Sequence, residues 1–130
     1  MPEAKPVKVI PASSLAESGG QTDGMIRQNA IVNLTDQICA SRMIAKPHSS
    51  SAVHHHGDQD TVVIALSGHG TIVSEGGKKK EKLAPGDYAL IPAWAEHQEV
   101  NEGDEEVVWA IVRSPGPAPK VENLEGWGKS

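Results

Sequence analysis

Residues 54–68 of the chain read HHHGDQDTVVIALSG. Three consecutive histidines are followed, after a short polar stretch, by a run over 61–66 that is rich in β-branched residues and closes at a glycine, a pattern typical of a β-strand. Residues two apart in a strand point to the same face, so we expect His54 and His56 on one side and His55 on the other. Two imidazoles on one face can share a metal ion when a further ligand comes from a facing strand.

The rest of the chain repeats this kind of pattern. Period-two alternation and glycine or proline punctuation dominate, and helical periodicity is hard to find. We expect six to eight short strands in an all-β barrel or sandwich, with strands within 25–34, 37–45, 61–70, 71–83, 84–100 and 107–113. A hairpin is predicted to turn at the glycine pair 76–77, and the basic run KKKEK at 78–82 to form a solvated turn.

Length and charge limit the function classes. At 130 residues the chain is expected to form one domain, with a barrel core over about residues 24–114, an N-terminal arm (1–23) and a tail rich in proline and glycine (115–130). The net charge of −5 argues against nucleic-acid and anionic-membrane partners, which need a cationic face. Several strands are apolar on both faces, so a second subunit is expected to cover one face, in a homodimer.

The expected location is cytoplasmic. Cys39 is the single cysteine, which excludes a disulfide within the chain and favours a reducing compartment, and its alternating neighbours favour a buried thiol. The first twenty residues lack the apolar run of a signal peptide, and no stretch approaches the roughly 20 apolar residues of a membrane span.

Two spaced motifs resemble those of the cupins. The stretch from His54 to Gly68 resembles the first cupin motif, G-x5-H-x-H-x3–4-E-x6-G, and GDYALIPAWAEHQEVN at 86–101 resembles the second, G-x5-P-x-G-x2-H-x3-N. His97 falls on the histidine of the second motif, and Trp94 stands where the family usually has glycine. With the intervening hairpin the resemblance covers about residues 48–101.

The resemblance implies a fold and a metal site. The fold is a double-stranded β-helix, a jelly-roll barrel, with one divalent metal ion in its mouth. The histidines that the motifs supply as ligands are His54, His56 and His97. The bound metal is expected to be Fe, Mn, Ni, Cu or Zn, between which the ligand set does not choose.

The first motif lacks its acidic ligand. Counting back seven residues from Gly68 puts Thr61 at the glutamate position, and a neutral hydroxyl is a poor ligand for a divalent ion. Either the site has three histidines or a neighbour replaces the acid. Gln59 shares the strand parity of Thr61, whereas Asp60 faces the other side unless a bulge reverses it.

Other residues are candidates for the pocket. Glu99 shares the parity of His97, so it either projects inward as an acid or base near the metal or lies on the rim. Trp94 and Tyr88 are candidate walls, since aromatic side chains often line small-molecule clefts, and Thr61 faces the same space. Arg27 either contacts a substrate carboxylate or pairs with an acidic rim residue.

The function expected from this resemblance is that of a metal-dependent enzyme acting on a small polar organic molecule. The metal would act as a Lewis acid or as an O2-activating centre, in a dioxygenase, isomerase or lyase. The alternative is a non-catalytic module that binds a metal or a small molecule, because the same fold houses both kinds of protein.

Overall fold

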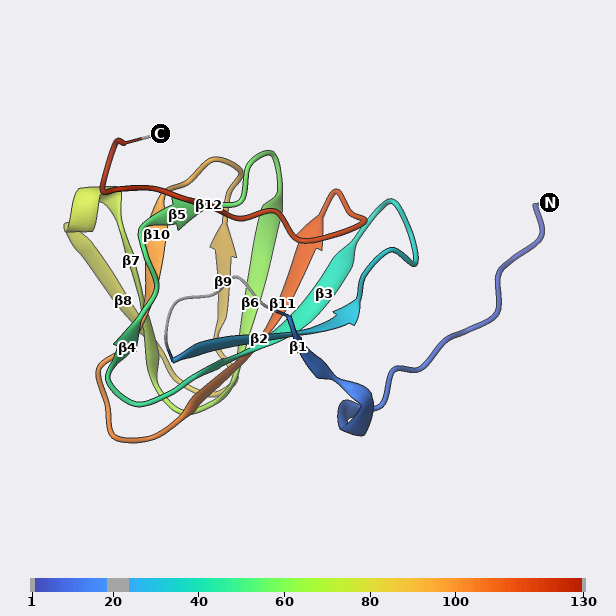
Figure 1. Cartoon of the computed structure of the whole chain (residues 1–130), viewed down its shortest axis with the longest axis horizontal. Helices are drawn as coiled ribbons and strands as arrows, with labels where there is room; N and C mark the ends of the chain where they lie inside the picture. Colours follow the sequence, from blue (N-terminus) through green and yellow to red (C-terminus); the bar gives the residue numbers. More distant parts are fainter. Residues whose placement is uncertain (1, 19–23, 130) are drawn as a thin grey trace.

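Two antiparallel β-sheets face each other in the computed structural model of the chain, which describes residues 2–18 and 24–129 (Figure 1). One sheet contains β1 (Ala16–Ser18), β2 (Met25–Ile31), β3 (Cys39–Ala45), β6 (Asp60–Ser67), β9 (Tyr88–Ile91) and β11 (Val107–Ser114). The other contains β4 (Ser49–Ser50), β5 (His54–His55), β7 (Gly70–Ser74), β8 (Lys79–Leu83), β10 (His97–Asn101) and β12 (Glu122–Asn123). Two short 3-10 helices are η1 (Ala12–Ser14) and η2 (Glu75–Gly77).

The strand order identifies the fold. The first sheet runs β1-β2-β3-β11-β6-β9 and the second β12-β5-β10-β7-β8, with β4 also paired to β10. Neighbours in each sheet include strands far apart in the sequence, such as β3 with β11 and β5 with β10, as in a jelly roll. The all-β double-stranded β-helix expected from the motifs is confirmed. No helix in the described ranges has the length and apolar character needed to cross a membrane.

Alternation along the strands builds the core between the sheets. In β3 and β11 buried residues alternate with half-exposed ones, so one face of each strand packs inward. Trp109 on β11 is the largest fully buried side chain and packs in a cluster with Met43, Val63 and Ile111. Burial of this apolar surface is the main term that stabilises the barrel.

The hairpin at residues 70–83 agrees with the sequence only in part. It turns through η2 at the predicted glycines, but the solvated turn expected for KKKEK is wrong, because β8 pairs with β7 over these residues. The strand lies at the edge of its sheet and four of its five side chains are exposed. Lysines on an edge strand oppose pairing with another chain, which gives this run a structural role.

Gly68 has a steric reason to be glycine. Its φ is 73°, in the left-handed region, and an added Cβ would lie 2.4 Å from the carbonyl oxygen of Glu106. The turn that closes the first motif therefore excludes every side chain.

Both termini of the chain add strands to the sheets. Within the predicted arm, β1 pairs with β2, while residue 1 and residues 19–23 lie outside the described residues, as does residue 130 of the tail. The tail runs back across the barrel, where β12 pairs with β5 (Figure 1).

Gln59 attaches the tail to the barrel. Its side chain is fully buried, and its amide nitrogen donates hydrogen bonds of 2.8 Å to the carbonyl oxygens of Pro115 and Ala118. Its amide oxygen accepts a hydrogen bond of 2.8 Å from the backbone N–H of Lys120. One side chain therefore satisfies three backbone groups of a segment that has little regular structure of its own.

We expect Gln59→Met, which keeps the volume but removes the hydrogen bonds, to lower the free energy of unfolding by about 2–4 kcal/mol, because buried backbone groups lose their partners. Urea unfolding monitored by tryptophan fluorescence measures the change. Asp58→Asn is the matched control, since it removes the exposed Lys120–Asp58 ion pair in the same loop and should leave the midpoint close to wild type. Equal midpoints for all three proteins would contradict the role of Gln59.

Candidate metal centre

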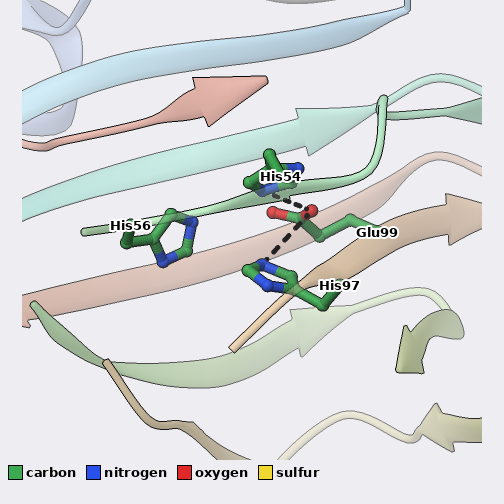
Figure 2. Close-up of side chains that lie close together, drawn as sticks. All are labelled: His54, His56, His97 and Glu99. Carbon is green, nitrogen blue, oxygen red and sulfur yellow. Dashed lines mark ion pairs between the residues drawn. The ribbon is translucent and has the colours of Figure 1, made fainter. Parts of the chain in front are cut away.

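Four side chains that can bind a metal meet inside the barrel (Figure 2). His54 lies on β5 with His56 just beyond its end, and His97 and Glu99 lie on β10. The two strands are neighbours, with His97 opposite His54. Each side chain offers one ligand atom, and the four atoms lie within 4.8 Å of one another. All four residues are buried.

The residues present fit a single divalent ion. Atoms bound about 2.1 Å from one metal lie about 3.0–4.2 Å from each other, so the cluster needs only a small closure to reach that geometry. Nε2 of His97 is buried without a hydrogen-bond partner in the described structure, although it points at the other ligand atoms. A buried nitrogen without a partner is costly unless something binds it. Imidazole and carboxylate donors together suit the divalent transition metals.

Backbone carbonyls set the tautomers of two histidines. Nδ1 of His54 lies 2.8 Å from the carbonyl oxygen of Ala52, and Nδ1 of His97 lies 3.0 Å from that of Ala95. A carbonyl oxygen only accepts, so each Nδ1 carries a proton and donates it. Nε2 is therefore the nitrogen that each ring presents to the cluster. Metal-binding histidines usually donate a hydrogen bond from the other ring nitrogen in this way.

Thr61 holds the third histidine. Its hydroxyl lies 2.8 Å from Nδ1 of His56, while Nη2 of Arg113 lies 3.3 Å from Nε2 of the same ring. Arginine can only donate a hydrogen bond, so Nε2 of His56 is the acceptor. Nδ1 of His56 therefore carries the ring proton and donates a hydrogen bond to the hydroxyl of Thr61. The residue that replaces the motif's glutamate is thus buried beside the site, but it positions a ligand and offers no carboxylate.

Glu99 supplies the carboxylate from another strand. Its Oε2 lies 3.1 Å from Nε2 of His54 and 3.7 Å from Nε2 of His97 (Figure 2). The hydroxyl of Ser51 donates to the same oxygen at 3.1 Å and accepts a hydrogen bond of 3.0 Å from the Glu99 backbone N–H. Glu99 is 7% exposed, so of the two positions expected from the sequence the rim is wrong and the interior is observed.

The charges of the cluster are arranged around Glu99. Burial by itself raises the pKa of Glu99, but the charge of His54 and its hydrogen bond oppose this, and the pKa lies well below its usual range. Burial likewise lowers the pKa of His54, and the charge and hydrogen bond of Glu99 reverse this, so the net pKa is raised. His54 and Glu99 therefore form a buried ion pair.

The other two histidines are neutral. Burial, followed by the charge of Arg113, lowers the pKa of His56 to about 2. Burial also lowers the pKa of His97, and Glu99 offsets this only in part. Neutral imidazole is the form that binds metals, so these two rings are ready to coordinate.

Neither neighbour of Thr61 reaches the cluster. Gln59 is committed to the backbone of the tail, and the exposed Asp60 accepts a hydrogen bond of 2.9 Å from the backbone N–H of Ala93. The expectation that one of them replaces the missing acid is corrected by the position of Glu99. Strand β6 is regular here, so Asp60 and Thr61 face opposite sides, as parity predicts.

A cavity lies next to the cluster. It is lined by Met25, Arg27, Met43, Ser51, His54, Glu99, Ile111, Arg113, Val121 and Asn123. The structure thus brings Arg27 to the site, as the sequence allowed. Arg113 was not among the sequence candidates, although it has the same strand parity as the core residue Trp109, a signal that places it inside.

The two remaining candidates, Trp94 and Tyr88, are exposed side chains outside the cluster, and His55 faces away from it as parity predicts. Trp94 is 64% exposed and lines a separate groove that His97 also borders, with φ at 66° where the motif has glycine. Tyr88 is 72% exposed and pairs with the outward-facing Ile64, so the expectation that it lines the metal cavity is corrected. His55 is buried outside the cluster, 3.4 Å from a carboxylate oxygen of Glu122 and with its ring 5.4 Å from that of Trp94.

Known sequences match this chain over much of its length. The family model of the cupin domain matches residues 41–113. An uncharacterised protein of Aquifex aeolicus (strain VF5) is 30% identical over 91 residues, which cover 70% of this chain and 74% of that protein. A 5-aminosalicylate 1,2-dioxygenase of Comamonas sp is 27% identical over 109 residues, 80% of this chain but only 28% of the dioxygenase.

Solved structures share the fold at low identity. The polyketide cyclase RemF from Streptomyces resistomycificus has a TM-score of 0.76 at 17% identity, over 95% of this chain and 89% of its own. Oxalate decarboxylase from Lactobacillus farciminis has a TM-score of 0.73 at 19% identity, over 86% of this chain and 34% of its own. The sequence match, the double-stranded β-helix and the histidine cluster lead to one conclusion: the chain belongs to the cupin family.

Proposed function

We propose that this cupin domain is a metal-dependent enzyme acting on a small polar organic molecule. His54, His56, His97 and Glu99 would hold one divalent ion of Fe, Mn, Ni, Cu or Zn. The observation that carries the proposal is the set of four buried ligand atoms within 4.8 Å, one of which, Nε2 of His97, has no hydrogen-bond partner among the described residues. When bound, such an ion supplies Lewis-acid polarisation of substrate oxygens or, if it is redox-active, activation of O2.

The residues prepare the site in different ways. A proton lies between Nε2 of His54 and the carboxylate of Glu99. A metal ion bound by these two groups would replace that proton, so we expect metal binding to release one proton to solvent. The carboxylate offsets one of the two charges of the ion, and the neutral rings of His56 and His97 offset none. One positive charge then remains to attract an anionic oxygen of the substrate.

Two classes of reaction suit this site. An O2-dependent dioxygenation is supported by the sequence similarity to a dioxygenase, although this chain spans 28% of that protein. An isomerisation or a lyase reaction such as a decarboxylation is supported by the fold shared with a polyketide cyclase and an oxalate decarboxylase. The rival from another class is a non-catalytic cupin that binds a metal or a small molecule without turnover.

We expect protein purified without a histidine tag to hold close to one metal equivalent per chain, and His97→Ala to bind at least about tenfold more weakly because it loses a ligand. Plasma mass spectrometry of dialysed protein measures the metal. His48→Ala is the matched control, since His48 is exposed, contacts the exposed Asp104 and is not one of the four residues of the cluster. A metal-free wild type that is as stable as His97→Ala would refute the metal centre.

The same proteins separate an enzyme from a binding module. Oxygen uptake by the Fe²⁺-loaded wild type is followed with catechols, aminosalicylates, β-diketones and thiols, and product formation without O2 is followed with the Zn²⁺- and Mn²⁺-loaded forms. Turnover by the wild type and His48→Ala, with none by His97→Ala, supports the enzyme. Full metal occupancy without turnover in either assay would favour the binding module.

We expect Glu99→Gln, which keeps the shape but removes the charge, to weaken metal binding by about tenfold or more, as loss of a ligand or its support does. Competition with a chelating dye measures the affinity, and circular dichroism checks the fold. A variant that keeps wild-type metal affinity but loses turnover would assign Glu99 to proton transfer only. A variant unchanged in both would remove Glu99 from the site.

Exposed apolar side chains support the homodimer that the strand pattern suggests. Leu66, Tyr88 and Leu90 are 50%, 72% and 66% exposed on the outer faces of β6 and β9, two paired strands. A second copy of the same sheet would cover this patch, and sedimentation equilibrium should give about twice the chain mass of 13.7 kDa. We expect Leu66→Arg with Leu90→Arg to give monomers, and Lys80→Asp on β8 to leave the mass unchanged. A monomeric wild type would refute the dimer.

A cytoplasmic location is supported by Cys39, which is a buried free thiol in the structure. Fractionation of the native cells tests this location. Recovery of the protein outside the cytoplasmic fraction would contradict it.

A further inference from the structure

Arg113 brings a guanidinium into the interior beside the histidine cluster. The residue is 4% exposed and lines the cavity together with His54 and Glu99. Its Nε and Nη1 are buried with no hydrogen-bond partner in the described structure, and its Nη2 reaches only Nε2 of His56, at 3.3 Å. A buried cation with two unused donor groups costs folding free energy, so these donors point to a ligand that binds there.

The charges around Arg113 favour an anionic ligand. Glu99 is the one acidic residue among those lining the cavity, and its carboxylate is already paired with His54 and bonded to Ser51. No ion pair joins Glu99 to Arg113 among the described residues, so the charge of Arg113 is added to the neutral pair of His54 and Glu99. The cavity therefore has more positive than negative charge before any metal is added.

Metal binding would release a further donor of Arg113. Nε2 of His56 has one lone pair, which accepts the contact from Nη2 and is also the lone pair that a metal needs. An ion held by His56 therefore leaves Nη2 without its present partner. The guanidinium fork, whose planar donors match a carboxylate in bidentate fashion, then becomes available next to the metal centre.

We propose that Arg113 binds the carboxylate of the substrate, and that the substrates are small organic acids whose remaining oxygen atoms reach the metal centre. Met25, Met43 and Ile111 form the apolar part of the same cavity wall. This assignment of the substrate class rests on the proposed metal site. It concerns the hydrogen bonds between Arg113 and the substrate carboxylate, whereas the metal would be held by the histidines and Glu99.

Glycolate and glycolamide are the probes, because they have the same size and differ in the charged carboxylate. Calorimetric titration of the Zn²⁺-loaded wild type should show glycolate binding at least about tenfold more tightly than glycolamide, as expected for a buried charge-assisted pair. Arg113→Gln and Arg113→Met should each weaken glycolate by about tenfold or more and leave glycolamide unchanged. Arg42→Gln is the matched control, because Arg42 is bonded to Gln28 away from the cavity.

The zinc content of each variant is measured on the same samples. Variants that keep zinc and still bind glycolate like the wild type would overturn the role of Arg113, as would a wild type that does not distinguish the two probes. A wild type that fails to hold zinc would instead refute the metal centre. Glycolate titration of the metal-free wild type and of the two Arg113 variants then decides whether Arg113 binds the anion.

Discussion

The buried contact between Glu99 and His54 is the constraint on which the rest of the site depends. A carboxylate inside a barrel loses its hydration, a cost of several kcal/mol unless charged and hydrogen-bonding partners replace the water. Here His54 supplies the opposite charge. The hydroxyl of Ser51 donates a hydrogen bond to the Glu99 carboxylate and accepts one from the Glu99 backbone N–H. The pairing of β5 with β10 brings these groups together, so the electrostatics of the centre follow from the sheet register.

The register itself needs support, because β5 contains only two residues. It is held between β10 on one side and β12 of the tail on the other. Gln59 secures the tail from the loop that follows the histidines, and the backbone N–H of Leu124 donates to the carbonyl of Val53 just before them. Residues far from the ligand atoms in sequence thus hold the short strand that carries His54 and leads to His56.

Much of the fold and part of the site could be predicted from the sequence. Period-two patterns located most strands, and parity separated His54 and His56 from His55, because side-chain direction in a strand depends only on local geometry. His97 required the resemblance to a family, since nothing local shows that β10 will lie beside β5. The replacement for the missing acid was sought close to Thr61 in sequence, whereas the structure offers Glu99, a neighbour only through the pairing of strands.

The burial of two charged residues, Glu99 and Arg113, is the clearest difference between the sequence-based expectation and the structure. Charge usually indicates exposure, and this rule places Glu99 on a rim and leaves Arg113 unnoticed in an apolar strand. Both residues are buried in the structure. Glu99 pairs with His54, and Arg113 lies in the wall of the cavity with two donor groups that have no hydrogen-bond partner among the described residues.

A divalent ion held by the cluster, together with the guanidinium of Arg113 and the carboxylate of Glu99, would leave a net charge of +2 inside the barrel. Such an excess would favour the binding of an anion, since the attraction between opposite charges grows as water is excluded. Binding of the metal, release of Arg113 from His56 and binding of an organic acid are therefore expected to favour one another.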